Sequence, residues 1–443
     1  MALTGLEIFK LLPKTNCGKC GSPTCLAFAM RLAAKKASID ECPDISNEAK
    51  AALGAASAPP IKLVTIGTGE NKLEIGNETV LFRHEQTFYH PTGMAILVED
   101  TDSNLESKIT EINNLVFERV GQILKVNLIA LKNSSNDTSK FTNAVKIIIQ
   151  NSKLPLILIS DNLSILEEGL KITASSKPLI YSANSSNYEK MANLAKQYNV
   201  PLVVSGENLD ELSDLTQKIT SLGVSDLILE VNKGDFLSNL TDLVQIRRLS
   251  LKKTFRPLGY PTLVKVLNTP SYDELFQVSV YICKYASIVI LSGIELWKHL
   301  SLLTLRQNIY TDPQKPIQVE SKIYDIGAVS DNSPVLVTTN FSLTYSLVSG
   351  EVEASRIPSY IIVVNTEGVS VLTAWAADKF NAEIITKYLK ESGIENKVKH
   401  RKVIIPGGVA VISGKLQELS NWEVLVGPRE ATGIPAFLKE IKI

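Results

Sequence analysis

The feature that most constrains how this chain can fold is an alternation of short apolar segments with longer amphipathic segments through its middle half. Continuous apolar runs are typical of strands buried on both faces, and a period of 3.6 is typical of helices. The expected strands are Ala95–Val98, Val126–Leu131, Leu156–Ile159, Leu179–Tyr181, Leu202–Val204, Leu227–Val231, Thr262–Val266 and Ile288–Leu291. Helical segments follow them, including Leu105–Val120, Thr138–Gln150, Tyr188–Tyr198 and Tyr272–Tyr285. Eight strand–helix units over about 215 residues fit a (β/α)8 TIM barrel better than an open doubly wound sheet.

Polar side chains stand at the ends of the expected strands, where a barrel of this kind has its catalytic mouth. They are Glu99–Asp100, Lys132–Asn133, Asp161–Asn162, Asn184, Glu207–Asn208, Glu230–Asn232, Asn268 and Ser292. Two interpretations remain open: these residues line a binding site, or they are N-caps of the following helices. The second is favoured, because Asp, Asn and Ser are the preferred caps and every unit needs one.

A different pattern begins beyond the proline-containing segment Thr311–Gln318. Four expected strands (Val335–Thr338, Tyr360–Val364, Lys402–Ile405, Glu423–Val426) alternate with four expected helices (Phe341–Ala354, Val371–Glu391, Gly408–Glu418, Ala431–Ile441). This order predicts a small doubly wound, Rossmann-like α/β domain, which binds ligands at the carboxyl ends of its strands. Three glycine-containing turns, Asn365–Ser370, Pro406–Val409 and Gly427–Gly433, fall at that edge. Each alone fits an ordinary capping turn equally well, and together they favour a site.

Four of the five cysteines lie in the first 42 residues, as Cys17, Cys20, Cys25 and Cys42, with the spacing C-x2-C-x4-C-x16-C. A [4Fe-4S] cluster is the favoured occupant, because it needs four thiolates and because Gly18 and Gly21 allow backbone N–H groups to turn toward sulfur. Structural zinc is the main alternative, although zinc ribbons usually use two C-x2-C pairs. Disulfides are less favoured, since no secretory segment precedes the cysteines.

The cysteines belong to an expected module of residues 1–57 with helices Gly5–Pro13, capped by Thr4, and Pro23–Lys36. Cys25 then lies at a helix start, where the helix dipole favours a thiolate. The segment Ala51–Pro60 has the composition of a mobile tether. The full division is a cluster domain (1–57), a connector (58–92) with strands at Ile61–Thr65, Lys72–Ile75 and Val80–Phe82, the barrel (93–311), a linker (312–324) and the C-terminal α/β domain (325–443).

The charge balance is even, with 46 basic and 46 acidic side chains, so it gives no reason to expect binding to nucleic acid or to a membrane surface. No apolar run reaches the length that a bilayer requires, and the N-terminus lacks a signal-peptide pattern. A cytoplasmic protein is therefore expected. The four histidines, His84, His90, His299 and His400, leave little material for imidazole-based sites.

The order of a cysteine module, a barrel and a ligand-binding α/β domain resembles the large (gamma) subunit of the corrinoid iron-sulfur protein of the reductive acetyl-CoA pathway. Cys17–Cys42, Ser370–Ala377 and Trp422–Ala431 carry the resemblance, which extends over the full chain. It implies a heterodimer with a small TIM-barrel subunit and a B12-type corrinoid between that partner and the C-terminal domain. It also implies that cobalt accepts a methyl group from methyltetrahydrofolate, through a methyltransferase, and donates it to CO dehydrogenase/acetyl-CoA synthase. The cluster would return Co(II) to Co(I).

The resemblance also implies where the corrinoid lies. The expected contacts are Asn340, Ser346, Ser370, Val371, Leu372, Thr373 and Gly433, with Thr373 nearest the lower face of cobalt. The alternative roles are helix capping for Ser370 and Thr373, and an N-cap of Phe341–Ala354 for Asn340. Corrinoid proteins that ligate cobalt through histidine carry an Asp-x-His-x-x-Gly loop, and no histidine here has that setting. A base-off corrinoid is therefore expected, since losing the axial nitrogen makes Co(II) easier to reduce.

Two other functions remain open. One is a free-standing pterin-dependent corrinoid methyltransferase, which would need acidic and amide side chains such as Asp161 and Asn162 to converge at the barrel mouth. The other is a corrinoid-free iron-sulfur electron-transfer protein. The methyl carrier is the favoured hypothesis, with no catalytic residue assigned and no complete turnover of its own.

Overall fold

A computed structural model describes residues 5–33, 37, 41–46, 49, 59–231 and 234–441. The chain forms two compact units: Met1–Arg83, Phe88–Leu115 and Val126–Tyr310 make the first, and His84–Thr87, Val116–Lys125 and Thr311–Ile443 the second. Several expectations concern positions outside the described residues: the Thr4 cap, the end of the second helix at Lys36, most of the tether Ala51–Pro60, and Asn232.

Two short helices form the described part of the cysteine module. They are α1 (Gly5–Leu11) and α2 (Cys25–Ala33), and they pack against each other through Ile8 and Phe28. Both expected helices are therefore present, and Cys25 is the first residue of α2. Thr24 accepts a hydrogen bond from the backbone N–H of Ala27 at 3.1 Å, which caps this helix and explains why it begins there.

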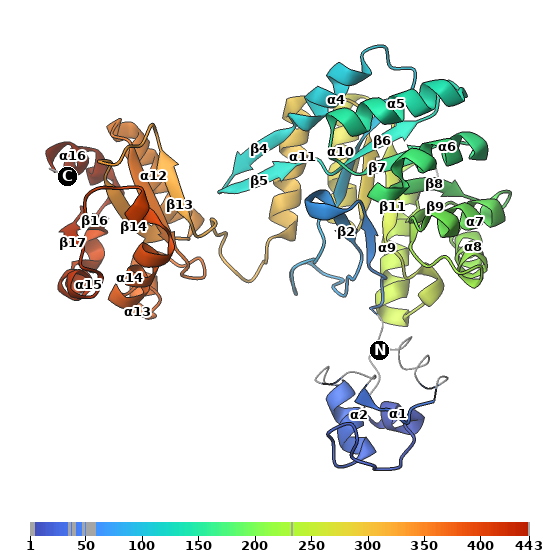
Figure 1. The fold of residues 1–443 in the computed structure, drawn as a ribbon, viewed down its shortest axis with the longest axis horizontal. Coiled ribbons are helices and arrows are strands. Elements are labelled where there is room, and N and C mark those ends of the chain that lie inside the picture. The colour runs from blue at the N-terminus through green and yellow to red at the C-terminus, as the bar shows by residue number, and fades with distance from the viewer. Residues whose placement is uncertain are drawn as a thin grey trace. The chain divides into compact units, whose positions relative to one another are not determined.

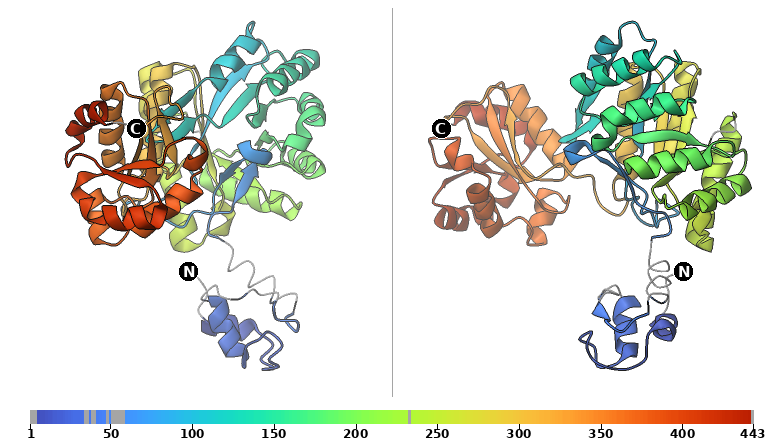
Figure 2. Two further views of the ribbon diagram at one scale, coloured as in Figure 1. Left: turned by 60° about the vertical axis from the view of Figure 1, so that its left-hand side comes forward. Right: turned by 45° about the vertical axis from the view of Figure 1, so that its right-hand side comes forward.

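A closed barrel of eight parallel strands forms the body of the first unit, as Figures 1 and 2 show. Its strands are β3 (Gly93–Glu99), β6 (Leu128–Lys132), β7 (Leu156–Ile159), β8 (Leu179–Ala183), β9 (Leu202–Val204), β10 (Leu227–Glu230), β11 (Thr262–Val266) and β12 (Ile288–Leu291). Its helices are α4 (Leu105–Asn113), α5 (Thr138–Asn151), α6 (Leu163–Thr173), α7 (Tyr188–Tyr198), α8 (Leu209–Ser221), α9 (Phe236–Lys253), α10 (Ser271–Cys283) and α11 (Leu296–Tyr310). The pairing of β12 with β3 closes the sheet, so the predicted barrel is confirmed.

The first barrel helix is shorter than predicted. A helix over Leu105–Val120 was expected, but α4 ends at Asn113 and the chain then forms a hairpin of β4 (Val116–Arg119) and β5 (Gln122–Lys125). The turn of this hairpin contains Val120 and Gly121, both with positive φ, a conformation that suits glycine and ends a helix. The hairpin belongs to the second unit, because Val120 packs into the apolar cluster around Tyr324.

The segment before the barrel packs against the amino ends of the barrel strands. Its antiparallel strands β1 (Val64–Ile66) and β2 (Leu73–Ile75) place apolar side chains against the lower layer of the barrel interior, where Leu128 and Leu263 lie. The expected third strand, Val80–Phe82, is not formed. These residues are instead held by side-chain contacts.

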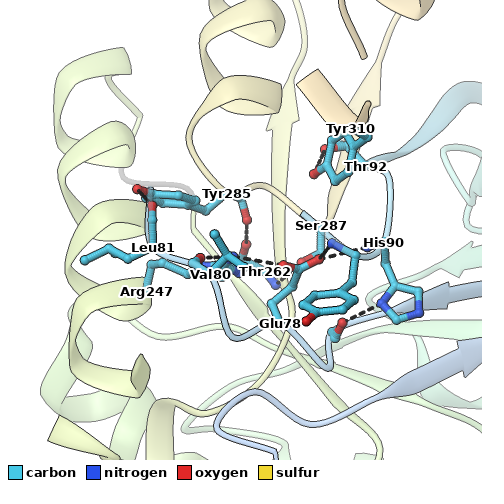
Figure 3. A network of polar contacts seen from close by, with 12 residues as sticks. Glu78, Val80, Leu81, His90, Thr92, Arg247, Thr262, Tyr285, Ser287 and Tyr310 are labelled. Carbon is cyan, nitrogen blue, oxygen red and sulfur yellow. Dashed lines mark hydrogen bonds and ion pairs between the residues drawn. The ribbon is translucent and has the colours of Figure 1, made fainter. Parts of the chain in front are cut away.

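A buried ion pair holds this segment to α9, as Figure 3 shows. Arg247 lies 3.0 Å from Glu78, and both side chains are less than a tenth exposed. Glu78 also accepts the backbone N–H groups of Tyr89 and His90, each at 2.8 Å, while Arg247 Nε donates to the carbonyl of Val80 at 3.0 Å. Each buried charge is thus paired and hydrogen-bonded, the condition under which such charges are tolerated in a protein interior.

The second unit contains a five-stranded sheet in the order β13 (Ile323–Ile326), β15 (Ser359–Val364), β14 (Val335–Thr339), β16 (Lys402–Ile405), β17 (Glu423–Val426). The last four strands are parallel. On one face α12 (Ser342–Ser355) packs with α16 (Ile434–Glu440), and on the other α14 (Ala382–Glu391) packs with α15 (Ser413–Ser420), as Figure 1 shows. The connections reverse direction between β14 and β16, where doubly wound sheets bind ligands.

Two expectations for this unit were wrong in detail. Strand β13 was not expected; it pairs antiparallel with β15, and its first two residues fall within the expected linker 312–324. The single expected helix Val371–Glu391 is two helices, α13 (Val371–Ala376) and α14. Asp378 between them has φ 58°, and Asn381 caps α14 by accepting from the Ile384 N–H. Asp and Asn favour helix ends over helix interiors. The break between α13 and α14 was missed because the helical period of the apolar residues was taken to continue through it.

Candidate functional site

The four cysteines of the N-terminal module lie near one another. Cys20, Cys25 and Cys42 belong to one apolar cluster with Phe28, and Cys17 is exposed. Burial raises the pKa of the Cys42 thiol, and the nearby charges of Cys20, Cys25 and Cys17 add to this effect. Four thiolates this close together repel one another unless a cation lies between them. Among the described residues, no three His, Cys, Asp or Glu side chains meet the geometry of a metal site.

The backbone between the cysteines turns at two glycines. Gly18 and Gly21 have φ of 71° and 70°, in the left-handed region that glycine adopts without strain. Asn16 was missed by sequence reasoning: its N–H donates to Cys25 Sγ at 3.4 Å, and its side-chain oxygen accepts from the Cys25 N–H at 2.8 Å. N–H donors of this kind stabilise a thiolate. The module therefore suits a group that requires four thiolate ligands.

The turns at the carboxyl edge of the C-terminal sheet are tied to one another. A Cβ on Gly407 would collide with backbone atoms of Gly427, Pro428 and Arg429, and the Gly407 N–H donates to the Pro428 carbonyl at 3.0 Å. Gly433 packs against Pro428 as well, since a Cβ there would lie 2.8 Å from its ring. The second and third expected turns therefore form one close-packed ridge, which is why glycine occupies these positions.

Asn340 fixes the remaining turn and does not cap a helix. Its side-chain oxygen accepts from the N–H groups of Thr366 and Gly368, at 2.9 and 3.0 Å, and from the Thr366 hydroxyl. Its amide group donates to Gln318 at 2.9 Å and to Asn365 at 3.2 Å. Asn340 is 2% exposed. The capping alternative was wrong, because the N-cap position of α12 belongs to Phe341.

The other expected contact residues lie on elements that leave this edge of the sheet. Ser346 is exposed on α12 between Leu343 and Leu347, which are each more than half exposed. Ser370 has the N-cap position of α13, but its hydroxyl caps no backbone group and instead lies 3.1 Å from that of Thr373. Val371 is half-buried, whereas Leu372 and Thr373 are exposed. The hydroxyl pair therefore remains accessible to a ligand.

Sequence reasoning expected Leu372 as a contact but did not single out two other exposed apolar side chains of this domain, Trp375 and Val411. Leu372 lies against Gly408, and Trp375 follows on α13. Val411, on the 3-10 helix Gly407–Ile412, is three-quarters exposed. With Leu343 and Leu347 they give this edge five exposed apolar side chains, which we call the apolar rim. A patch of this kind usually marks a surface that another group covers.

At the barrel mouth, most of the expected polar residues serve the fold. Asn162 and Asn208 cap α6 and α8 through their side-chain oxygens, as the favoured interpretation predicted. Glu230 is different: its buried carboxylate accepts from the Tyr181 hydroxyl and pairs with Lys265 at 3.0 Å. Burial, and then the negative charge of Glu230, raise the pKa of Tyr181. The three groups satisfy one another inside the barrel.

Comparison with known proteins identifies the family. The family description "CO dehydrogenase/acetyl-CoA synthase delta subunit" matches residues 63–438, and "Putative Fe-S cluster" matches residues 12–43, which contain all four cysteines. The chain is 50% identical over 441 residues to the corrinoid/iron-sulfur protein large subunit of Moorella thermoacetica, covering 99% of each protein. The chain belongs to the corrinoid/iron-sulfur protein large-subunit family.

Other members of this family are more distant in sequence. The gamma subunit of the acetyl-CoA decarbonylase/synthase complex of Methanothermobacter thermautotrophicus is 37% identical over 459 residues, covering 100% of this chain and 99% of that protein. The resemblance found from the sequence is thus confirmed, and the names of the Moorella relative and of the matching Fe-S family support both expected cofactors. Among solved structures, dihydropteroate synthase from Vibrio fischeri matches 55% of this chain and 97% of its own, with 14% identity and a TM-score of 0.40.

Proposed function

We propose that this chain is the large subunit of a methyl-carrying corrinoid iron-sulfur protein in the reductive acetyl-CoA pathway. The observation that carries the proposal is the 50% identity over 99% of both chains to a corrinoid/iron-sulfur protein large subunit. The proposed partners are a small TIM-barrel subunit, a methyltetrahydrofolate:corrinoid methyltransferase and CO dehydrogenase/acetyl-CoA synthase. When bound, the corrinoid supplies a cobalt that accepts and releases a methyl group, and the iron-sulfur cluster supplies electrons.

The cysteine module is proposed to hold a [4Fe-4S] cluster through Cys17, Cys20, Cys25 and Cys42. Cys25 and Cys42 are buried while Cys17 is exposed, so the thiols run from the interior of the module to its surface. An exposed thiol at one side is useful for electron transfer, because it allows a redox partner to approach the cluster closely. The Asn16 N–H would stabilise the Cys25 thiolate.

The carboxyl edge of the C-terminal sheet is proposed to hold the corrinoid. The apolar rim offers a surface for the hydrocarbon face of a macrocycle, since burying apolar area is the main favourable term in such binding. Ser370 and Thr373 add two hydroxyls beside it, free of any capping bond. The buried Asn340 would act indirectly, by holding the turn 365–369 from which α13 starts.

The base-off state is proposed because His400 is badly placed to reach cobalt. It precedes β16 and so lies at the amino edge of the sheet, opposite the proposed site. Its Nδ1 accepts the Lys402 N–H at 3.2 Å, so its Nε2 carries the proton and donates to the Ser333 carbonyl at 2.9 Å. Both ring nitrogens are therefore occupied. His84, the other histidine of this unit, lies in the connector.

The test is anaerobic co-purification of the chain with the small subunit, followed by iron, zinc and cobalt analysis. Iron and cobalt without zinc are expected, together with a corrinoid absorption band and the broad cluster shoulder. The Co(II) electron paramagnetic resonance spectrum should show no nitrogen hyperfine splitting from a protein ligand, and His400→Ala and His84→Ala should leave it unchanged. Zinc in place of iron, or no cobalt, would refute the proposal. Methyltetrahydrofolate binding by the chain alone would favour the pterin-dependent methyltransferase.

A further inference from the structure

The turn that leads into α13 contains two consecutive residues with positive φ. Glu367 has φ 58° and Gly368 has φ 77°. Glycine adopts this conformation without strain, whereas a glutamate adopts it only where its surroundings hold it there. The bond that closes the turn is long, since the Val369 N–H donates to the Thr366 carbonyl at 3.5 Å. The turn therefore depends on contacts from outside it.

The buried amide of Asn340 provides such contacts in only one of its two orientations. Its oxygen accepts from the N–H groups of Thr366 and Gly368, so its NH2 group points the other way and needs acceptors of its own. Those acceptors are the side-chain oxygens of Gln318, at 2.9 Å, and Asn365, at 3.2 Å. Gln318 makes the shorter of these two bonds. It thus helps to keep the Asn340 oxygen directed at the turn.

Gln318 comes from the linker that precedes the C-terminal sheet. An antiparallel bridge fastens this part of the linker to the segment between β14 and α12. The Val319 N–H donates to the Asn340 carbonyl at 2.9 Å, and the Ser342 N–H donates to the Ile317 carbonyl at 3.0 Å. These bonds fix the backbone on both sides of Gln318, which lowers the entropic cost of holding its side chain against Asn340.

The Gln318 side chain also packs directly against the turn. A Cβ on Gly368 would lie 2.7 Å from Gln318 Cγ and 3.2 Å from its Cδ. Glycine is therefore needed at position 368 both for its positive φ and for this close approach. Gln318 meets the turn in two ways, through the Asn340 amide and through its own stem.

The place of this turn decides where the exposed hydroxyl pair of α13 lies. Only Val369 separates Gly368 from Ser370, whose hydroxyl lies 3.1 Å from that of Thr373. The Thr366 hydroxyl lies 3.0 Å from the Val369 carbonyl oxygen, which ties that residue to the turn as well. A shift of the turn would therefore move Ser370 with it.

We infer that Gln318 is a positioning residue for the corrinoid, because through Asn340 and Gly368 it sets the place of the Ser370–Thr373 hydroxyl pair. The inference rests on the proposed function and adds the linker to the proposed site. Two features of the Gln318 side chain are required: an oxygen that accepts from Asn340, and a stem that fills the space beside Gly368. Removing the oxygen while keeping the stem should loosen the turn.

The first measurement is backbone hydrogen exchange of residues 365–370 in the full chain purified without corrinoid. Gln318→Met keeps the stem and removes the acceptor, so exchange should be about tenfold faster, the change expected for one hydrogen bond. Gln318→Glu keeps an acceptor oxygen and should restore the parent rate. The matched control Gln314→Met makes the same substitution at an exposed position of the same linker and should leave exchange unchanged.

The second measurement is the electron paramagnetic resonance spectrum of Co(II) in the anaerobically purified complex with the small subunit. Gln318→Met should alter this spectrum in samples that retain cobalt, and Gln318→Glu should restore it. A residue that only stabilised the fold would lower the melting temperature and leave the spectrum of the cobalt-loaded protein unchanged. If Gln318→Met does not fold, Gln318→Asn takes its place, because the shorter side chain withdraws the oxygen from Asn340.

The outcomes separate the positioning role from the function. Parent-like exchange in Gln318→Met would overturn the inference. Faster exchange with an unchanged Co(II) spectrum would also overturn it, since Gln318 would then hold the turn and nothing more. The same conclusion follows if Gln318→Glu behaves as Gln318→Met does. A parent chain that binds no cobalt overturns the proposed function, while the exchange rates still decide whether Gln318 holds the turn.

Discussion

The Lys265 ammonium and the Glu230 carboxylate form an ion pair at 3.0 Å inside the carboxyl end of the barrel. The pair lies where barrel enzymes bind their substrates. Here the Tyr181 hydroxyl completes it, and the Lys265 ammonium lies 4.5 Å from the centre of the Tyr181 ring. These three side chains therefore satisfy one another at the mouth of the barrel.

Removing one partner of this pair should destabilise the barrel. Lys265→Met leaves the Glu230 carboxylate buried with only a hydroxyl beside it, so we expect a loss of about 3 kcal/mol. The double variant Lys265→Met/Glu230→Leu should recover most of that loss, because no unpaired charge remains. Urea unfolding followed by circular dichroism measures both. Equal stability of the single and double variants would show that the loss of unfolding free energy does not come from the unpaired Glu230 carboxylate.

Acid should weaken the junction of α10 and α11 through Glu295. Hydrogen bonds from Lys298 and Ser271 lower the pKa of its carboxyl to about 2, from a usual value of 4.5. The folded state thus favours the charged form; the stabilisation is complete above about pH 4.5 and is lost as the pH falls toward 2. The melting temperature should fall less steeply from about pH 5 to about pH 3 in Glu295→Gln than in the parent chain. Parallel curves would contradict this assignment.

Asn340→Ala should loosen the turn that precedes α13. The substitution leaves the buried N–H groups of Thr366 and Gly368 without an acceptor, so we expect a cost of about 2–4 kcal/mol. Corrinoid retention should fall with it, because Ser370 and Leu372 follow that turn. Asn396→Ala is the control, since Asn396 is exposed and its loss should change neither stability nor corrinoid retention. If Asn340→Ala is as stable as the parent chain, the turn 365–369 does not depend on the Asn340 hydrogen bonds.

Thr373→Val should alter the spectrum of Co(II) more than it alters corrinoid content. The substitution keeps the shape of an exposed side chain and removes the hydroxyl that pairs with Ser370. Cobalt analysis and electron paramagnetic resonance of the same sample separate the two effects. Ser349→Ala, farther along α12, provides the comparison. Complete loss of the corrinoid would mean that Thr373 holds the macrocycle itself.

Cys20→Ala should remove the cluster and leave methyl transfer from already reduced cobalt within about two-fold of the parent rate. We expect this because the cluster is proposed to deliver electrons to cobalt and to take no part in the transfer of the methyl group. Iron analysis shows the loss, and a single-turnover assay with chemically reduced protein measures the transfer. A slow single turnover would place the cluster in the transfer step itself.

The sequence predicted the barrel because most of its strands are continuous apolar runs, which distinguishes them from the helices on either side. It failed at Val116–Lys125, because the hairpin strands Val-Phe-Glu-Arg and Gln-Ile-Leu-Lys lack the strict apolar–polar alternation that marks a strand. It also missed the break at Asp378, since one φ angle decides it. The cysteine spacing located the N-terminal site. The roles of Asn340 and Asn16 could not be predicted, because their partners come from other segments.

The β4–β5 hairpin means that the second unit is not a contiguous stretch of sequence. A Cβ on Gly121 would collide with the Tyr324 hydroxyl, and Tyr324 stacks on Tyr345 with ring centres 4.6 Å apart. A recombinant fragment that starts at the proline-containing linker would leave this aromatic face bare and would be prone to aggregate. Transplanting the domain into another carrier protein would therefore require residues 116–125 to be grafted with it.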